Sequence, residues 1–273
     1  MTDNKYYRTL TIAGSDSGGG AGIQADLKTF AAFGCFGMSV ITALTAQNTV
    51  DITAIQCVPA DFIGKQIDAV LEDIGVDAVK IGMLCNDKVI NVIAEKLNKW
   101  KVNNIVLDTV MISKSGARLL NDDAVNTLRI KLFPIASIVT PNIPEAGILS
   151  GILIENRTDM ENAAKKILSM GPKSVLIKGG HSNEVLCLDL LCIQGFNGKF
   201  EMYWFESKRI DTTNTHGTGC TLSSAIAAHL AKGLSIKDAV ENAKNYITCA
   251  IEAGAKYKTG KGHGPVHHFY NLW

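Results

Sequence analysis

Short runs rich in β-branched residues alternate with segments of helical length along most of the chain, and this alternation limits the possible folds more than any other feature. The expected strands are Thr9–Ala13, Ser39–Leu44, Ala78–Ile81, Ile105–Leu107, Ser137–Val139 and Val175–Ile177. The expected helices are Gly22–Phe33, Ala60–Ile74, Lys88–Trp100, Asp122–Leu132 and Met160–Met170. Strands joined through helices pair in parallel, so the pattern predicts an α/β fold with a mostly parallel central sheet.

The last third of the chain departs from this alternation. Strand-like runs at Val185–Cys192, Phe200–Phe205 and Arg209–Thr212 follow one another without helices between them. Such a succession predicts an antiparallel hairpin at one edge of the sheet. Two helices, Thr218–Ala231 and Ile236–Ala253, are expected to close the chain. No internal repeat, low-complexity tract or linker marks a domain boundary, so one domain is expected.

The charge balance and the cysteine pattern exclude several classes of protein. The chain has 27 basic and 26 acidic residues, a formal net charge of +1, and therefore no general field for nucleic acid or an anionic membrane. No run is long and apolar enough to span a bilayer, and Met1–Arg8 lacks an apolar signal core, so a cytoplasmic protein is expected. The cysteines are odd in number and form no C-x-x-C pair, which favours reduced thiols over a disulfide framework or a zinc site.

A glycine-rich stretch, Asn214–Leu222, stands directly before an alanine-rich helical run. The first amides of a helix lack intrahelical partners and lie at the positive end of its dipole, so Gly217 and Gly219 would let a phosphoryl group approach bare N–H groups. The same field would stabilise the thiolate of Cys220 and make it a candidate base or nucleophile. The simpler alternative is a helix start that only tolerates glycine.

Polar residues follow three expected strands at the edge where open α/β sheets bind ligands. Asp108 ends one strand, Asn142 and Glu145 follow the next, and Lys178 ends a third. Two carboxylates, a lysine and an anion-binding loop together suit magnesium and phosphates. Each residue alone is more often a helix cap or a surface charge, so the prediction rests on their convergence.

Ordered sequence blocks carry a resemblance to a known family. The blocks are Thr11–Asp16, Gly19–Thr29, Val40–Thr49, Lys80–Leu84, Val106–Met111, Thr140–Ala146, Ile177–His181, His216–Ser223 and Gly262–Phe269. With them the chain resembles the ribokinase-like fold and, within it, the hydroxymethylpyrimidine and phosphomethylpyrimidine kinases of thiamine biosynthesis. The resemblance implies a single domain over residues 1–273, built as a three-layer α/β/α sandwich with a short flap near 110–116.

The resemblance also implies an activity and its cofactors. Kinases of this family use ATP to phosphorylate 4-amino-5-hydroxymethyl-2-methylpyrimidine and then convert the monophosphate to the pyrophosphate. ATP and Mg²⁺ are the implied cofactors, and a small aminopyrimidine alcohol and its monophosphate are the implied partners. A homodimer is expected, because the family usually forms dimers; no nucleic acid or membrane is expected as a partner.

By resemblance, catalysis depends on an anion hole and a few charged side chains. Residues whose backbone N–H groups would form the anion hole are Gly217, Thr218, Gly219 and Cys220. Lys178 would offset charge on the nucleotide phosphates, while Asp108 and Glu145 would hold Mg²⁺ directly or through water. The nucleotide is expected to contact Lys178, Asn142, Gly217 and Gly219. Many ribokinase-like enzymes place an aspartate base where this chain has Cys220, which is our candidate acceptor of the substrate hydroxyl proton.

Substrate recognition is expected in the first half of the chain. Gln47 offers an acceptor and a donor on one planar group, which matches the amino group and the adjacent ring nitrogen of an aminopyrimidine. By resemblance, Gly14 lets the ring approach the backbone, and Met83 and Val110 supply apolar contacts. Asp26 matches a pocket residue of the family, but it could equally lie in the first turn of its helix and offset the dipole.

Three alternatives to the pyrimidine kinase remain open at this point. A pyridoxine, pyridoxal or pyridoxamine kinase uses the same scaffold on a pyridine, and Gln47 is the residue that discriminates between the two. An ATP-dependent hydro-lyase of the nicotinamide-hydrate repair type shares the fold but leaves no phosphorylated alcohol. A precursor sensor would bind the pyrimidine without turnover. The segment 110–116 is expected to act as a flap that excludes water, unless it is an ordinary loop.

Overall fold

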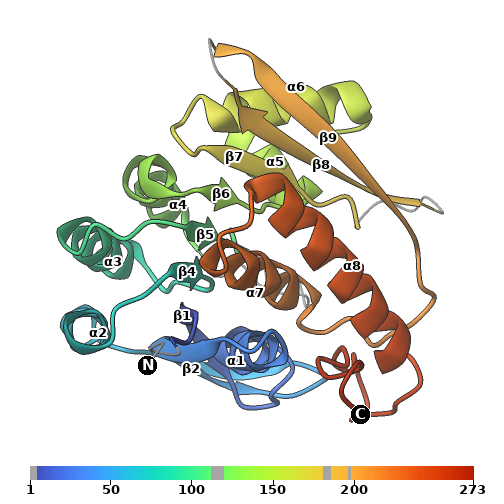
Figure 1. The fold of residues 1–273 in the computed structure, drawn as a ribbon, viewed down its shortest axis with the longest axis horizontal. Helices are drawn as coiled ribbons and strands as arrows, with labels where there is room; N and C mark the ends of the chain where they lie inside the picture. The colour runs from blue at the N-terminus through green and yellow to red at the C-terminus, as the bar shows by residue number, and fades with distance from the viewer. Residues whose placement is uncertain (1–4, 112–119, 181–185, 196–197) are drawn as a thin grey trace.

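A single sheet of nine strands runs through the part of the chain that this computed structural model describes, residues 5–111, 120–180, 186–195 and 198–273 (Figure 1). In order across the sheet the strands are β3 (Ile52–Cys57), β2 (Phe36–Gln47), β1 (Arg8–Asp16), β4 (Ala78–Ile81), β5 (Ile105–Leu107), β6 (Ile138–Val139), β7 (Ser174–Ile177), β8 (Leu186–Gln194) and β9 (Phe200–Lys208). The pairs from β2 to β7 are parallel, and the pairs at both edges are antiparallel. The predicted mostly parallel sheet with an antiparallel edge hairpin is confirmed.

Helices cover both faces of the sheet and complete three layers. The helices are α1 (Gly22–Ala32), α2 (Ala60–Asp73), α3 (Asp87–Lys99), α4 (Asp122–Lys131), α5 (Ile143–Ser150), α6 (Arg157–Leu168), α7 (Thr218–Ala231) and α8 (Ile236–Gly254), with a 3-10 turn η1 (Phe133–Ile135) after α4. Helices α1, α7 and α8 pack on one face, and α2 to α6 pack on the other (Figure 1). None of the described helices is long and apolar enough to cross a membrane.

The central strands are buried on both faces, which explains their continuous apolar sequences. In β4, Val79 and Ile81 join the core under α2 to α6, whereas Ala78 joins the core under α7 and α8. Side chains alternate along a strand, so Lys80 lies on the same face as Ala78, and it is completely buried there. A charged side chain at such a place needs a buried counter-charge.

Three local features differ from the prediction. Strand β3 was not expected, because four of its six residues are exposed and give no apolar alternation. Helix α5 was not expected either, because it has only eight residues and contains Gly147, which has a low helix propensity; Pro144 lies in its first turn, where proline is tolerated. The run Arg209–Thr212 was predicted as a strand and is not one: β9 ends at Lys208, and the chain then leaves the sheet to reach α7.

The expectation of reduced thiols is wrong for one pair of cysteines. Cys57 at the end of β3 and Cys85 after β4 form a disulfide, with Cα atoms 6.2 Å apart. The two are 28 residues apart in sequence and match no common motif. They meet because the segment after β4 reaches back to β2, where Thr42 Oγ1 donates a hydrogen bond of 2.7 Å to the carbonyl oxygen of Met83. The disulfide therefore lies beside a predicted substrate contact.

Candidate active site

A cavity of about 920 Å³ opens at the carboxyl ends of the parallel strands, beside the first turn of α7. From β1 the chain moves outward to β2 and β3 and then returns to β4 on the other side of β1. The cavity thus lies at the switch point of the sheet, where open α/β sheets bind ligands. The predicted site residues that line it are Gly14, Gln47, Met83, Asp108, Val110, Asn142, Glu145, Lys178, Gly217, Thr218, Gly219 and Cys220. Of the predicted set, Asp26 alone is not part of the lining.

The first turn of α7 is left uncapped toward this cavity. Helices α3, α4, α5, α6 and α8 each begin with an Asn or Ser whose side chain accepts a backbone N–H. Helix α7 begins instead at Gly217, which has a φ of 80° and no side-chain cap. A Cβ at Gly217 would lie 1.8 Å from the carbonyl oxygen of Gly20, so no other residue fits. A Cβ at Gly219 would lie 3.6 Å from Lys178 Nζ. An uncapped helix start that faces a lysine favours a bound anion.

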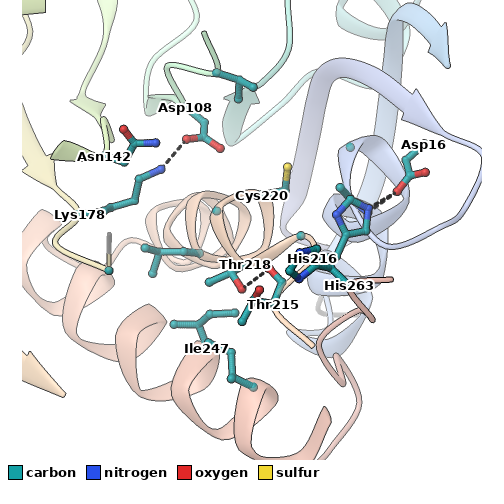
Figure 2. Close-up of a pocket in the computed structure, with 18 of the residues that line it drawn as sticks. Asp16, Asp108, Asn142, Lys178, Thr215, His216, Thr218, Cys220, Ile247 and His263 are labelled. Atoms are coloured by element: carbon teal, nitrogen blue, oxygen red, sulfur yellow. Dashed lines mark hydrogen bonds and ion pairs between the residues drawn. The ribbon is translucent and has the colours of Figure 1, made fainter. Parts of the chain in front are cut away.

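Lys178 and Asp108 form an ion pair at this end of the cavity, with Nζ 3.0 Å from Oδ1 (Figure 2). Asp108 also accepts hydrogen bonds from Thr140 Oγ1 at 3.1 Å and Ser223 Oγ at 3.3 Å. Burial by itself raises the pKa of Asp108 and lowers that of Lys178, but the opposite charges nearby outweigh it. The pKa of Asp108 is therefore lowered and that of Lys178 raised, and both groups stay charged.

Asn142 and Glu145 hold each other at the start of α5. Asn142 Oδ1 accepts from the backbone N–H of Glu145, and Glu145 Oε2 accepts from that of Asn142, each over 2.9 Å. This reciprocal pair is a capping box. Burial raises the pKa of Glu145, although Lys178 opposes the shift. The helix-cap alternative is therefore correct for both residues, and both also line the cavity.

Few carboxylate oxygens at this end are free to bind a cation directly. Asp108 Oδ1 contacts Lys178, and Glu145 Oε2 contacts the backbone of Asn142. Among the residues that the structure describes, no three Asp, Glu, His or Cys side chains converge into a metal cage. Mg²⁺ keeps several waters and is usually held by one or two carboxylates together with substrate phosphates. The pair of carboxylates fits Mg²⁺ that is held through water and carried by a nucleotide.

Cys220 lies in the first turn of α7, between the Lys178–Asp108 pair and the opposite end of the cavity (Figure 2). Burial raises the pKa of its thiol to about 11, although Lys80 nearby lowers it. The expected stabilisation of the thiolate is therefore wrong, because loss of hydration, together with the negative charges of Asp26 and Asp108, outweighs the effect of Lys80. On the same turn, Thr218 Oγ1 donates to the carbonyl oxygen of Thr215 over 2.8 Å. The turn thus presents backbone N–H groups and a neutral thiol.

The opposite end of the cavity is lined by Gly14, Gln47, Met83 and Val110. Gly14 lies at an irregularity in the pairing of β1 with β2. A Cβ on Gly14 would lie 3.3 Å from Met83 Sδ, so glycine keeps this part of the cavity open. Gln47 ends β2, which runs three residues beyond the predicted strand, and is partly exposed like Met83 and Val110. Apolar walls and one planar amide suit a flat heterocycle.

A pair that the sequence analysis missed lies beside Gln47. His216 Nε2 is 2.9 Å from Asp16 Oδ2, and the two residues are 200 positions apart in sequence (Figure 2). Burial raises the pKa of Asp16, but hydrogen bonds from His216 and from backbone N–H groups outweigh it, so the pKa is lowered. No spacing rule relates these residues. The only signal available was that each stands in one of the sequence blocks that carry the resemblance.

Asp26 lies beneath the cavity and not in its wall. It is completely buried in the second turn of α1, and both of its oxygens are 2.8 Å from Lys80 Nζ. Thr11 and Ser224 also donate to it, over 2.6 and 2.7 Å. The alternative that Asp26 offsets the helix dipole from the first turn is not supported, because that turn holds no acidic residue. Lys80, which does line the cavity, is the residue through which Asp26 reaches it.

A second ion pair supports the loop that follows Lys178. Asp189 lies 2.7 Å from Lys244 of α8 and accepts the backbone N–H of Gly179 over 2.8 Å. Both charged residues also line the cavity, and the sequence analysis did not single them out. Of the predicted flap near 110–116, the stretch from 112 onward lies outside the described residues.

Comparison with known proteins gives a consistent result. A family model described as phosphomethylpyrimidine kinase matches residues 16–267. A bifunctional thiamine biosynthesis protein of Geobacter sulfurreducens is 49% identical over 95% of this chain, which spans only 51% of that protein. The hydroxymethylpyrimidine/phosphomethylpyrimidine kinase of Salmonella typhimurium is 46% identical, over 97% of this chain and 98% of its own length.

A solved structure supports the fold. The ADP complex of Bacillus subtilis pyridoxal kinase superposes with a TM-score of 0.87 and 37% identity, and the match covers 98% of this chain and 99% of that one. The predicted ribokinase-like architecture is thereby confirmed, and a relative with the same fold binds a nucleotide.

Proposed function

The chain belongs to the phosphomethylpyrimidine kinase family, and from this premise we propose that its cavity transfers a phosphoryl group from ATP to the hydroxymethyl oxygen of 4-amino-5-hydroxymethyl-2-methylpyrimidine. A second transfer to the monophosphate gives the pyrophosphate used in thiamine biosynthesis. The observation that carries the proposal is the Lys178–Asp108 pair, which faces the uncapped start of α7 across Gly219. Residues 1–273 would act as one domain.

The phosphoryl end would work by charge and position. The transferred group passes through a loose transition state whose charge is spread over its oxygens, so fixed positive groups lower the barrier. Lys178 and the N–H groups of Gly217, Thr218, Gly219 and Cys220 would surround those oxygens. Because α7 lacks a side-chain cap, no side chain has to be displaced before the anion binds, and of these N–H groups that of Thr218 makes a long hydrogen bond of 3.4 Å to the carbonyl oxygen of Thr215. Asn142 would contact the nucleotide through its amide nitrogen, since its oxygen caps α5.

Asp108 and Glu145 would hold Mg²⁺ through water. The metal supplies charge neutralisation on the nucleotide phosphates. Asp108 keeps its negative charge because of its lowered pKa. Glu145 has a raised pKa, and a cation placed nearby would favour its ionised form. Asp108 would thus supply a carboxylate of lowered pKa, and Glu145 a second carboxylate whose ionised form the metal–nucleotide complex would favour.

The acceptor end would recognise the pyrimidine by shape and hydrogen bonding. Gln47 would pair with the amino group and the adjacent ring nitrogen, while Met83 and Val110 would contact the ring faces. Gly14 would allow close approach of the ring, because a side chain there meets Met83. Asp26 would take part only through Lys80, which it holds beneath the cavity.

Cys220 would receive the hydroxyl proton only as a thiolate, after its own proton has passed to water. With a thiol pKa of about 11, the group is protonated at neutral pH and is not a preformed base. A loose transition state needs little deprotonation of the acceptor at its start. Full turnover of Cys220→Ser at every pH would leave only the backbone N–H of this residue with a catalytic part.

Pyridoxal kinase activity is the second candidate, because a pyridoxal kinase structure shares this fold closely. Family membership sets aside the hydro-lyase and the sensor. The test incubates purified protein with Mg-ATP and, in parallel, the pyrimidine, its monophosphate, pyridoxal or pyridoxine, and identifies the products by mass spectrometry. Formation of both pyrimidine phosphates supports the proposal. Turnover of pyridoxal or pyridoxine alone would show that the protein is a vitamin B6 kinase instead.

A homodimer and a cytoplasmic location complete the proposal. Leu44, Val50, Ile55 and Phe62 are exposed apolar residues on or next to the β2–β3 edge, and a second subunit would cover such a surface. ATP-dependent biosynthesis suits the cytoplasm, but the Cys57–Cys85 disulfide opposes that location, because disulfides are uncommon there. Light scattering would test the dimer. Mass spectrometry of acid-quenched, alkylated protein would test whether the disulfide forms, and so the objection to a cytoplasmic location.

A further inference from the structure

The Asp16–His216 pair joins the turn after β1 to the loop before α7. Asp16 is 2% exposed, and its oxygens accept backbone N–H groups from Gly18 at 2.8 Å, Gly20 at 3.0 Å and Ala21 at 2.8 Å. His216 donates to the same carboxylate. A charged acceptor that binds four donors is rigid, since moving it would leave several buried groups unpaired.

The ring of His216 is held in place by its surroundings. A Cβ on Gly20 would lie 2.3 Å from His216 Cδ2, so the ring packs directly on that glycine. The backbone N–H of His216 donates to the carbonyl oxygen of Gly264 over 3.0 Å, and a β-bridge joins His216 to Pro265. The backbone of His216 is therefore fixed, and the close contact with Gly20 limits rotation of its ring.

Gln47 is held at both its backbone and its side chain. Its backbone N–H donates to Ser17 Oγ over 2.8 Å, and Ser17 Oγ donates to its carbonyl oxygen over 2.7 Å. Its side-chain amide lies between Thr45 Oγ1, 3.1 Å from Oε1, and His216 Nε2, 3.4 Å from Nε2. The amide thus has one neighbour at each end.

The hydrogen-bond donors around Gln47 fix which way its amide points. Thr45 has a single hydroxyl proton, and the carbonyl oxygen of Ser15, 2.9 Å away, accepts it. Thr45 can then only accept from Gln47. His216 uses its Nε2 proton toward Asp16, so it cannot accept from Gln47 either. Both contacts become favourable when the amide is turned so that its nitrogen faces Thr45 and its oxygen faces His216, since the Nε2 proton bound to Asp16 at 2.9 Å is then shared with the amide oxygen at 3.4 Å.

We propose that His216 is a positioning and specificity residue, which orients the Gln47 amide for a 4-aminopyrimidine. This rests on the proposed function. With its outer sides held by His216 and Thr45, the amide presents its remaining oxygen lone pair and its remaining N–H to the substrate. An amino group beside a ring nitrogen offers the complementary donor and acceptor.

Substitution of His216 tests the proposal through the Michaelis constants. His216→Leu removes the donor and retains bulk, whereas His216→Gln places an amide N–H near the position of Nε2. We expect His216→Leu to raise KM for the pyrimidine about tenfold, with KM for ATP and kcat changed by less than about threefold, which corresponds to one lost hydrogen bond. His216→Gln should restore most of the loss, and KM for pyridoxal should change less than KM for the pyrimidine.

A double-variant cycle with Gln47→Ala separates positioning from a structural role. If His216 acts through Gln47, His216→Leu should add less than about twofold to the pyrimidine KM of Gln47→Ala. Fully multiplicative effects would overturn the proposal. So would a fall in kcat with unchanged pyrimidine KM, because His216 would then serve the anion-binding turn. Failure of the wild type to bind or phosphorylate the pyrimidine would refute the proposed function itself and is seen before any variant is made.

Nitrogen-15 NMR of the wild-type histidines keeps the test independent of variant folding. The proposal requires the His216 proton on Nε2 in the absence of ligand, and the signal is assigned by its loss in His216→Gln. A proton found on Nδ1 alone would contradict it, because Asp16 would then lack its donor and the argument for the amide orientation would fail.

Discussion

The two ends of the cavity are built differently. At the phosphoryl end, Lys178, Asp108 and Glu145 are charged or chargeable groups whose positions are fixed by burial and by one another. At the acceptor end, Gln47 is a neutral, partly exposed amide whose orientation depends on contacts with Thr45 of β2 and with His216 of the loop before α7. The difference indicates a division of work: the first end lowers the barrier to transfer, and the second end selects the molecule that receives the group.

The buried pair beneath both ends gives the largest expected effect. Asp26→Asn leaves the ammonium of Lys80 without its counter-charge in a place that water does not reach. We expect a loss of roughly 3–5 kcal/mol in the free energy of unfolding, measured by urea titration. Asp61→Asn is the control, since its pair with Lys65 is exposed and should contribute little. Equal effects of the two substitutions would show that the pair is not a structural support for the cavity.

Lys178→Met should give the next largest effect, and it should fall on kcat. Removing one preorganised charge from a transition state costs about 10²–10³ in rate, while the pyrimidine KM should change by less than about threefold. Steady-state kinetics with saturating Mg-ATP measure both constants. Lys173→Met, an exposed lysine just before β7, is the matched control. A change mainly in the pyrimidine KM would contradict the claim that Lys178 serves the phosphoryl end alone.

Gln47→Ala should produce a smaller effect, and it should fall on the pyrimidine KM instead of kcat. Loss of two neutral hydrogen bonds, at about 1 kcal/mol each, predicts a rise of roughly thirtyfold in the pyrimidine KM, with kcat nearly kept. Pyridoxal turnover should be affected less, because a pyridine lacks the amino group beside a ring nitrogen. Turnover of the pyrimidine and of pyridoxal is compared in one set of assays. Equal losses of turnover for the two substrates would show that Gln47 does not select the pyrimidine.

Cys220 gives the smallest expected effect near neutral pH. Its thiol pKa is raised to about 11, so the folded state binds this proton more tightly than the unfolded state does. The resulting contribution to stability is present below the unfolded pKa and is lost as the pH rises through about 11. Alkylation of Cys220, followed by peptide mass spectrometry, should accelerate toward that pH. An inflection near the ordinary thiol pKa of about 8.5 would contradict the burial argument.

The phosphoryl end could be predicted from sequence because parallel strands bring their carboxyl ends to one edge. Asp108, Glu145 and Lys178 each follow a recognisable apolar run, and Gly217 precedes a recognisable helix. Their convergence in space then follows from the order of strands alone. What the sequence could not supply was the sign of the pKa shift at Cys220, because the degree of burial depends on the packing of the first turn of α7.

The acceptor end could be predicted only in part. Gln47 was identified through its residue type and the family resemblance, whereas the Asp16–His216 pair that supports it joins positions 200 residues apart. Asp26 was expected in the cavity wall. It lies below the wall instead, where its carboxylate pairs with the buried side chain of Lys80. The Cys57–Cys85 disulfide was missed for a similar reason, since it depends on how the segment after β4 crosses back to β2.

The division of work between the two ends is tested most directly by combining Lys178→Met with Gln47→Ala. The measured quantity is kcat/KM for formation of the pyrimidine monophosphate, followed by mass spectrometry in the wild type, both single variants and the double variant. Independent ends predict that the two free-energy losses add to within about 0.5 kcal/mol. A double variant no worse than Lys178→Met alone would show that the ends act as one unit and would contradict the account.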